Sequence, residues 1–128
     1  MDSHQLEWIK SALHGVVVEK EGTAHAESLL GVDMAGKTGT AQVTHVTPRG
    51  VDSDRVWYFN RDHAWFAGYA PHAAPEIAIV AMIEHGGGGG KNAVPVASRV
   101  VQEWQKLKER PITGKRGARD DDAEPREP

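Results

Sequence analysis

The sequence predicts an α+β fold in which an antiparallel sheet is flanked by an N-terminal and a C-terminal helix. Apolar residues at helical spacing near both ends and apolar, β-branched runs between them favour this class. The 128 residues have room for one domain, and 39% hydrophobic residues suit a soluble protein. We assign residues 1–110 to that domain and residues 111–128, which contain almost no apolar residue, to a disordered tail.

The N-terminal helix is predicted over residues 3–18. Its apolar positions recur every three to four residues: Leu6, Ile9, Leu13 and Val16. Gly22 and Thr23 break this pattern. We expect a second, short helix over residues 24–30, with Thr23 as its N-cap and Gly31 after its end.

The C-terminal helix is predicted to begin at Asn92 as N-cap, with Pro95 in the first turn, where proline is tolerated. Pro111 stops it. Five apolar residues form a stripe that is expected to pack on the core: Val96, Ala97, Val100, Trp104 and Leu107.

Three strands are predicted between the helices, over residues 34–46, 64–70 and 77–83. The last two form a hairpin joined by a turn at 71–75, and the loop 47–62 contains a short extended piece at 56–59. The run 77–83 is continuously apolar, which predicts a central strand covered on both faces. Two helices alone give such a sheet little cover, and this indicates missing partners.

The chemistry lies on the first of these strands. Lys37 can bind a carboxylate or set the charge near a proton acceptor. Thr38 and Thr40 alternate with it, project to one face, and can donate hydrogen bonds to one anionic group. Gly39 lets a substrate backbone lie along the strand edge, an arrangement that suits a peptide added as an extra strand.

This strand resembles the third signature of penicillin-binding proteins and serine β-lactamases, whose set is Ser-x-x-Lys, Ser-x-Asn and Lys-Thr-Gly. The order of the flanking segments resembles the C-terminal part of the transpeptidase domain of class B penicillin-binding proteins, elongation type (the penicillin-binding protein 2 group). The resemblance covers roughly residues 5–108. It is carried by Gly22-Thr23-Ala24, by Ala35-Gly36-Lys37-Thr38-Gly39-Thr40-Ala41-Gln42-Val43, by residues 62–71 (Asp-His-Ala-Trp-Phe-Ala-Gly-Tyr-Ala-Pro) and by residues 75–80 (Pro-Glu-Ile-Ala-Ile-Val).

The resemblance implies a partial β-lactamase/transpeptidase-like fold and a role in peptidoglycan cross-linking by serine acyl transfer. It assigns catalytic roles to Lys37 and Thr40, and substrate binding to Thr38, Gly39 and Thr40. Lys37 would supply positive charge beside the nucleophile, and the two threonines would hold the substrate carboxylate. The backbone N–H of Thr40 would be one of two oxyanion-hole donors. The implied location is the periplasmic face of the bacterial inner membrane, with the anchor upstream of this chain.

The chain departs from the family in its serines, which are Ser3, Ser11, Ser28, Ser53 and Ser98. None has a lysine three residues later or an asparagine two residues later. Two of the three signatures are therefore absent, and we expect the chain alone to be inactive. A non-catalytic module that binds stem peptide or a cell-wall protein through the same strand is the alternative.

Gly86–Gly90 and Lys91 lie between a strand and a helix, the context of a phosphate-binding loop. That motif needs glycine where His85 stands and Ser or Thr where Asn92 stands, so a flexible connection is the better interpretation.

The seven histidines include no metal-binding motif, although His63 and His85 could approach each other across the hairpin. Core packing explains Trp65 and Trp104, whereas Trp57-Tyr58-Phe59 in the loop is a candidate contact for substrate or partner.

Net charge, cysteine content and the length of apolar runs exclude few classes of function. A formal net charge of -3 gives no electrostatic case for nucleic acid as partner, and the absence of cysteine rules out disulfides and thiolate chemistry. No apolar run reaches the ~20 residues of a membrane span. The expected partners are peptidoglycan stem peptide, β-lactams in the intact enzyme and the rest of the transpeptidase domain. We expect no cofactor and no metal.

Overall fold

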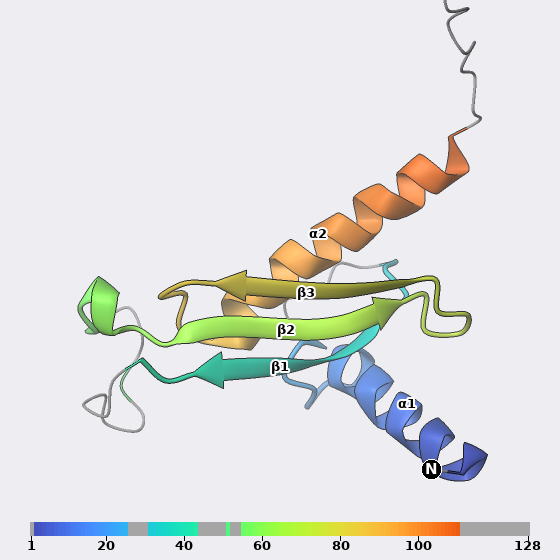
Figure 1. The fold of residues 1–128 in the computed structure, drawn as a ribbon, viewed down its shortest axis with the longest axis horizontal. Helices are drawn as coiled ribbons and strands as arrows, with labels where there is room; N and C mark the ends of the chain where they lie inside the picture. The colour runs from blue at the N-terminus through green and yellow to red at the C-terminus, as the bar shows by residue number, and fades with distance from the viewer. Residues whose placement is uncertain (1, 26–30, 44–50, 52–54, 111–128) are drawn as a thin grey trace, which may run out of the picture.

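The computed structural model describes residues 2–25, 31–43, 51 and 55–110. Its elements are α1 (Ser3–Val18), β1 (Ala35–Ala41), the 3-10 helix η3 (Tyr58–Asn60), β2 (His63–Ala70), β3 (Ile77–Ile83) and α2 (Gly89–Glu109). The three strands form one antiparallel sheet in the order β1-β2-β3. In Figure 1, α2 crosses behind the sheet and α1 lies at the β1 side. The predicted α+β class is confirmed.

Helix α1 has the predicted bounds. Its start is fixed by a capping box: the Asp2 carboxylate accepts from the backbone N–H of Gln5 at 2.8 Å, and the Gln5 side chain accepts from the Asp2 N–H at 3.2 Å. After α1 the chain folds back so closely on the helix that a Cβ on Gly22 would lie 2.3 Å from the carbonyl oxygen of Val16. The predicted short helix over 24–30 lies mostly outside the described residues.

The strands follow the predicted order. β3 has the predicted bounds, β2 begins one residue early, and β1 ends at Ala41 within the predicted strand 34–46, whose last three residues lie outside the described part. The expected extended piece at 56–59 is wrong, because residues 58–60 form a 3-10 turn in which the Asn60 N–H donates to the carbonyl oxygen of Trp57 at 2.8 Å. The predicted disordered tail over residues 111–128 lies outside the described residues.

The prediction that 77–83 is a central strand is also wrong for this sheet. β2 is central, and β3 is an edge strand whose side chains alternate between half-buried and exposed up to the buried Ala81. Val80 is 65% exposed on the face away from α2. An apolar run cannot by itself distinguish a strand buried on both faces from one whose second face lacks a cover.

The core lies between the sheet and α2. Its fully buried members are small apart from Phe66 and Met34: Ala24, Ala64, Ala70, Ala93, Val94, Ala97 and Val101. Small residues let the backbones approach. A Cβ on Gly36 would lie 2.5 Å from the Phe66 ring, and one on Gly68 would lie 2.4 Å from the carbonyl oxygen of Ala35. The ring of Phe66 therefore fills the space above two glycines.

Helix α2 differs from the prediction at its start. It begins at Gly89 with Gly88 as N-cap, and Asn92 lies inside it, donating its side-chain amide to the carbonyl oxygen of Gly86. Pro95 therefore lies within the helix, beyond the first turn. The helix ends at Glu109 and leaves Arg110 as C-cap before Pro111, as predicted.

The predicted apolar stripe on α2 mostly faces away from the core. Of its five members only Ala97 is buried, and Val100 and Leu107 are 52% and 61% exposed. The side facing the sheet is lined instead by smaller residues, since the helix lies close to the strands. The expected core roles of Trp65 and Trp104 are wrong as well, because Trp65 is 38% exposed and Trp104 is only half-buried. Among the described helices, none is long and apolar enough to cross a membrane.

Candidate active-site strand

Strand β1 carries the Lys37-Thr38-Gly39-Thr40 sequence along one edge of the described sheet. It pairs only with β2, in the register Lys37↔Ala67 and Thr38↔Phe66. Directly paired residues share a face, so the threonines point to the side of the buried Phe66 and Lys37 points to the exposed side. The alternation that the sequence predicted is present. The second edge of β1 has no strand partner among the described residues.

Lys37 and Thr38 form a polar cluster with Thr23, which lies in the turn after α1. The Lys37 ammonium donates to the carbonyl oxygen of Thr38 at 3.0 Å and lies 3.4 Å from the Thr38 hydroxyl. That hydroxyl is 2.8 Å from the hydroxyl of Thr23. Fifteen residues separate the two threonines in the sequence, so only the fold brings them together.

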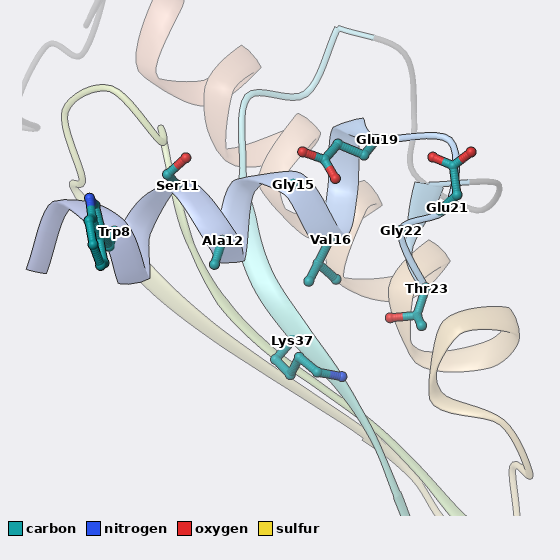
Figure 2. A pocket seen from close by; sticks show the side chains of 10 residues that line it. All are labelled: Trp8, Ser11, Ala12, Gly15, Val16, Glu19, Glu21, Gly22, Thr23 and Lys37. Atoms are coloured by element: carbon teal, nitrogen blue, oxygen red, sulfur yellow. The ribbon is translucent and has the colours of Figure 1, made fainter. Parts of the chain in front are cut away.

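A cavity of about 550 Å³ opens beside this cluster, between α1 and β1. Figure 2 shows Lys37 on one wall, the side chains of Trp8, Ala12 and Val16 along α1, and Thr23 at the end of the turn. One side of the space is apolar. Its polar lining combines the Lys37 ammonium and the Thr23 hydroxyl with the carboxylates of Glu19 and Glu21.

Thr40 lies apart from that cluster. It is exposed and lines a second hollow of about 290 Å³ together with Arg61, Asp62, Gly87 and Lys91. The structure thus brings Lys37, Thr38 and Thr23 together beside one hollow, and Thr40, further along the same strand, lines another.

Gly39 lies under the first turn of α2. A Cβ on Gly89 would lie 2.3 Å from the carbonyl oxygen of Gly39 and 2.5 Å from that of Trp65. A Cβ on Gly39 itself would meet only the Cβ of Trp65, at 3.3 Å. The helix therefore rests on the strand backbone from one side, and on the other side there is space at Gly39 itself.

This contact gives the glycine-rich segment a structural role. Gly89 and Gly90 belong to α2, and Gly87 donates its backbone N–H to the carbonyl oxygen of Asp62 at 2.7 Å. The interpretation as a flexible connection missed the close approach that the glycines permit. A phosphate-binding loop is disfavoured on the same ground, because these glycines are packed against protein backbone.

His63 and His85 meet across the hairpin, as predicted. The backbone N–H of His85 donates to Nδ1 of His63 at 2.9 Å, and Nδ1 of His85 lies 3.2 Å from the carbonyl oxygen of Arg61. Both rings thus have protein partners. Within the described residues, no group of three or more His, Cys, Asp or Glu is placed to hold a metal.

One titrating group near the start of β1 is perturbed. Burial raises the pKa of Tyr69, which pairs with Ala35, above its ordinary value of 10.0. Glu7 and Asp33 act in the same direction on this pKa, and Lys10 opposes them.

The sequence matches the family described as "Penicillin binding protein transpeptidase domain" over residues 1–102. The chain belongs to the penicillin-binding protein transpeptidase family. It is 33% identical over 97 residues to the peptidoglycan D,D-transpeptidase MrdA of Haemophilus influenzae and 35% identical over 100 residues to MrdA of Acinetobacter baumannii. These alignments cover 74% and 77% of this chain. The chain spans about 15% of the length of either relative.

Solved structures agree with this assignment. The penicillin-binding protein PBP2 of Helicobacter pylori, in a complex with MreC, matches 85% of this chain and 18% of its own with a TM-score of 0.64 at 32% identity. PBP2 of Pseudomonas aeruginosa, in complex with WCK 5153, matches 80% of this chain and 19% of its own with a TM-score of 0.60 at 33% identity. The resemblance to the penicillin-binding protein 2 group is confirmed.

Two features of the site were not predicted from the sequence. Thr23 was predicted to be a helix cap, and its contact with Thr38 has no local sequence signal beyond the Gly-Thr-Ala segment that contains it. The packing of Gly89 and Gly90 was missed because a run of five glycines indicates flexibility as readily as close approach.

Proposed function

We propose that this chain is the C-terminal segment of a serine peptidoglycan D,D-transpeptidase and provides the substrate-binding strand of its active site. The observation that carries the proposal is β1: a Lys-Thr-Gly-Thr strand with one edge unpaired among the described residues, beside a cavity lined by Lys37 and Thr23. Membership of the transpeptidase family supports the reaction class. The substrates are stem peptides and, by analogy of shape and charge, β-lactams.

In the proposed mechanism the stem peptide lies along the free edge of β1 as an added strand. The hydroxyls of Thr38 and Thr40, which project from the same face of β1, bind its terminal carboxylate, and the ammonium of Lys37 lies beside the Thr38 end of this pair. The nucleophilic serine, from the upstream part of the domain, attacks the peptide carbonyl, and the backbone N–H of Thr40 stabilises the developing oxyanion. Gly39 leaves room for the substrate backbone. The reaction takes place on the periplasmic face of the inner membrane.

Variants of β1 in the intact enzyme test these roles. Lys37→Ala should slow acylation by a β-lactam on the order of a hundredfold, with a smaller effect on initial binding, because the charge matters most in the transition state. Thr38→Val and Thr40→Val keep the β-branched shape and remove one hydroxyl each. They should slow acylation by a β-lactam that carries the carboxylate and spare its neutral methyl ester. Thr40→Val should leave the oxyanion donor in place, since that donor is the backbone N–H.

A bulky residue at Gly39 gives a steric test, since it should block peptide substrates while all three polar side chains remain. Acylation of Lys37→Ala at the parent rate would contradict the assignment. Equal losses of the threonine variants with the acid and the ester would do the same.

The chain alone should form no covalent adduct with penicillin. None of its serines has a lysine one helical turn later to accept the hydroxyl proton. Intact-mass spectrometry after incubation with penicillin measures this directly, and the mass of an opened β-lactam on any serine would refute it.

The absence of a Ser-x-x-Lys segment from the chain favours one alternative, a non-catalytic stem-peptide binding module. Titration of the chain with N-acetyl-D-alanyl-D-alanine separates the two: saturable binding by the chain in isolation supports the module. A Ser-x-x-Lys segment encoded upstream in the same reading frame supports the enzyme.

A further inference from the structure

The turn that carries Thr23 is held in place by α1 and α2. The next residue, Ala24, is fully buried and donates its backbone N–H to the carbonyl oxygen of Val16 in α1 at 3.1 Å. From the other side, the first turn of α2 packs on the turn, since a Cβ on Gly90 would lie 2.3 Å from the carbonyl oxygen of Thr23. The Thr23 side chain is nevertheless exposed and lines the cavity beside Lys37 (Figure 2).

The hydroxyl of Thr23 is directed at the hydroxyl of Thr38, with 2.8 Å between the two oxygens. Each hydroxyl has one proton to donate. Their mutual hydrogen bond uses one of these protons, whichever threonine donates it, and leaves the other free. Lys37 lies 3.4 Å from the Thr38 oxygen and can only donate. The pair therefore leaves one hydroxyl proton unused, close to the Lys37 ammonium, in a cavity that is also lined by the carboxylates of Glu19 and Glu21.

We propose that Thr23 is a positioning residue of the carboxylate site. Its hydroxyl fixes the rotamer of the Thr38 hydroxyl, so that the pair presents one O–H, beside the ammonium of Lys37, to the terminal carboxylate of the substrate. The inference rests on the proposed function and adds to β1 a residue from the turn after α1. The ligand it selects is an anion, because a neutral ester accepts a hydrogen bond more weakly and gains nothing from the adjacent charge.

The test is made in the intact enzyme with Thr23→Val, which removes the hydroxyl, and Thr23→Ser, which keeps it. Acylation rates are measured with one β-lactam as its free carboxylate and as its methyl ester. Thr23→Val should lower the acylation rate with the carboxylate about tenfold, the usual weight of one hydrogen bond to a charged group. The rate with the ester should stay within about twofold of the parent rate on the same reasoning. Thr23→Ser should retain the parent rates with both ligands.

Coupling to Thr38 provides a second readout. If the two hydroxyls act as one unit, the double variant Thr23→Val, Thr38→Val should lose little more than the more affected single variant. A purely structural role would lower both ligands' rates alike and would not be restored by serine. Should valine disturb the packing beside Gly90, seen as a lower unfolding midpoint, Thr23→Ala removes the hydroxyl without adding bulk.

Three outcomes overturn the inference: parent rates in Thr23→Val and Thr23→Ala, equal losses with acid and ester, or strictly additive losses in the double variant. Lys37→Ala, measured alongside, distinguishes failure of the role inferred for Thr23 from failure of the proposed function. If Lys37→Ala is slow and Thr23→Val is not, Thr23 is only structural and the proposed strand stands. If Lys37→Ala acylates at the parent rate, the proposed function itself fails.

Discussion

The two faces of the sheet are built from the same strands and have opposite surroundings. On one face, Phe66 and Ala81 are buried beneath α2. On the other face, Trp65, Val80 and Met82 are 38%, 65% and 42% exposed. The two sets alternate along β2 and β3, so the difference arises from what covers each face. Burial of one face stabilises the described fold, whereas the other face leaves large apolar side chains partly exposed.

The largest loss of stability is expected from a cavity between α2 and the covered face of the sheet. Phe66→Ala should lower the free energy of unfolding by about 3–5 kcal/mol. It removes a fully buried ring and leaves a cavity, because the neighbouring glycines have no side chains to fill the space. Val80→Ala on the other face should change it by less than about 0.5 kcal/mol. Urea denaturation of both variants measures this, and similar losses would show that the two faces are equally packed.

Shifting the helix on the covered face should cost somewhat less. In Gly89→Ala the new Cβ would meet backbone oxygens at 2.3 Å and 2.5 Å, so α2 must move away from β1. We expect a loss of about 1–3 kcal/mol. Gly88→Ala is the matched control, since a Cβ there meets nothing within 4 Å and its φ of -76° suits any residue. Equal stability of the two variants would contradict the close contact between α2 and β1.

The uncovered face should make the isolated chain self-associate. It combines exposed apolar side chains with an outer edge of β3 that is unpaired in the described sheet. Replacing Val80 and Met82 with threonine keeps the strand propensity and lowers the apolar area. Sedimentation velocity should then show a smaller associated fraction than for the parent chain. A parent chain that is already monomeric, with sharp cooperative unfolding, would refute this expectation.

The smallest effect concerns Tyr69 on β2 and appears only in alkali. Because burial raises its pKa, the folded state holds the phenol proton more tightly than the unfolded state. The resulting stabilisation is complete below the ordinary pKa of 10.0 and is lost as pH rises through the raised value. Tyr58→Phe leaves Tyr69 as the only tyrosine, so its absorbance titration at 295 nm should lie above pH 10. Tyr69→Phe should remove this part of the alkaline loss of stability, and a midpoint at or below 10 would contradict the assignment.

The sequence by itself determined the local features of this protein. Capping at Asp2 and the helical period fix α1, and the alternation of Lys37, Thr38 and Thr40 follows from the two-residue repeat of a strand. The Lys-Thr-Gly-Thr segment and its flanks were enough to identify the family. Capping, helical period and strand alternation depend on residues that are close in the sequence, so they can be predicted from it directly.

The tertiary structure alone decided which surfaces are covered and which distant groups meet. The sequence run 77–83 predicted a central strand, yet β3 is an edge strand here, because burial depends on neighbours that the run does not specify. The stripe with Val100 and Leu107 predicted the wrong inner side of α2, since close helix–sheet packing selects small side chains over large ones. Thr23 reaches Thr38 only because α1, β1 and the first turn of α2 converge on one turn. Convergence of that kind depends on packing over long sequence separations, and no local pattern encodes it.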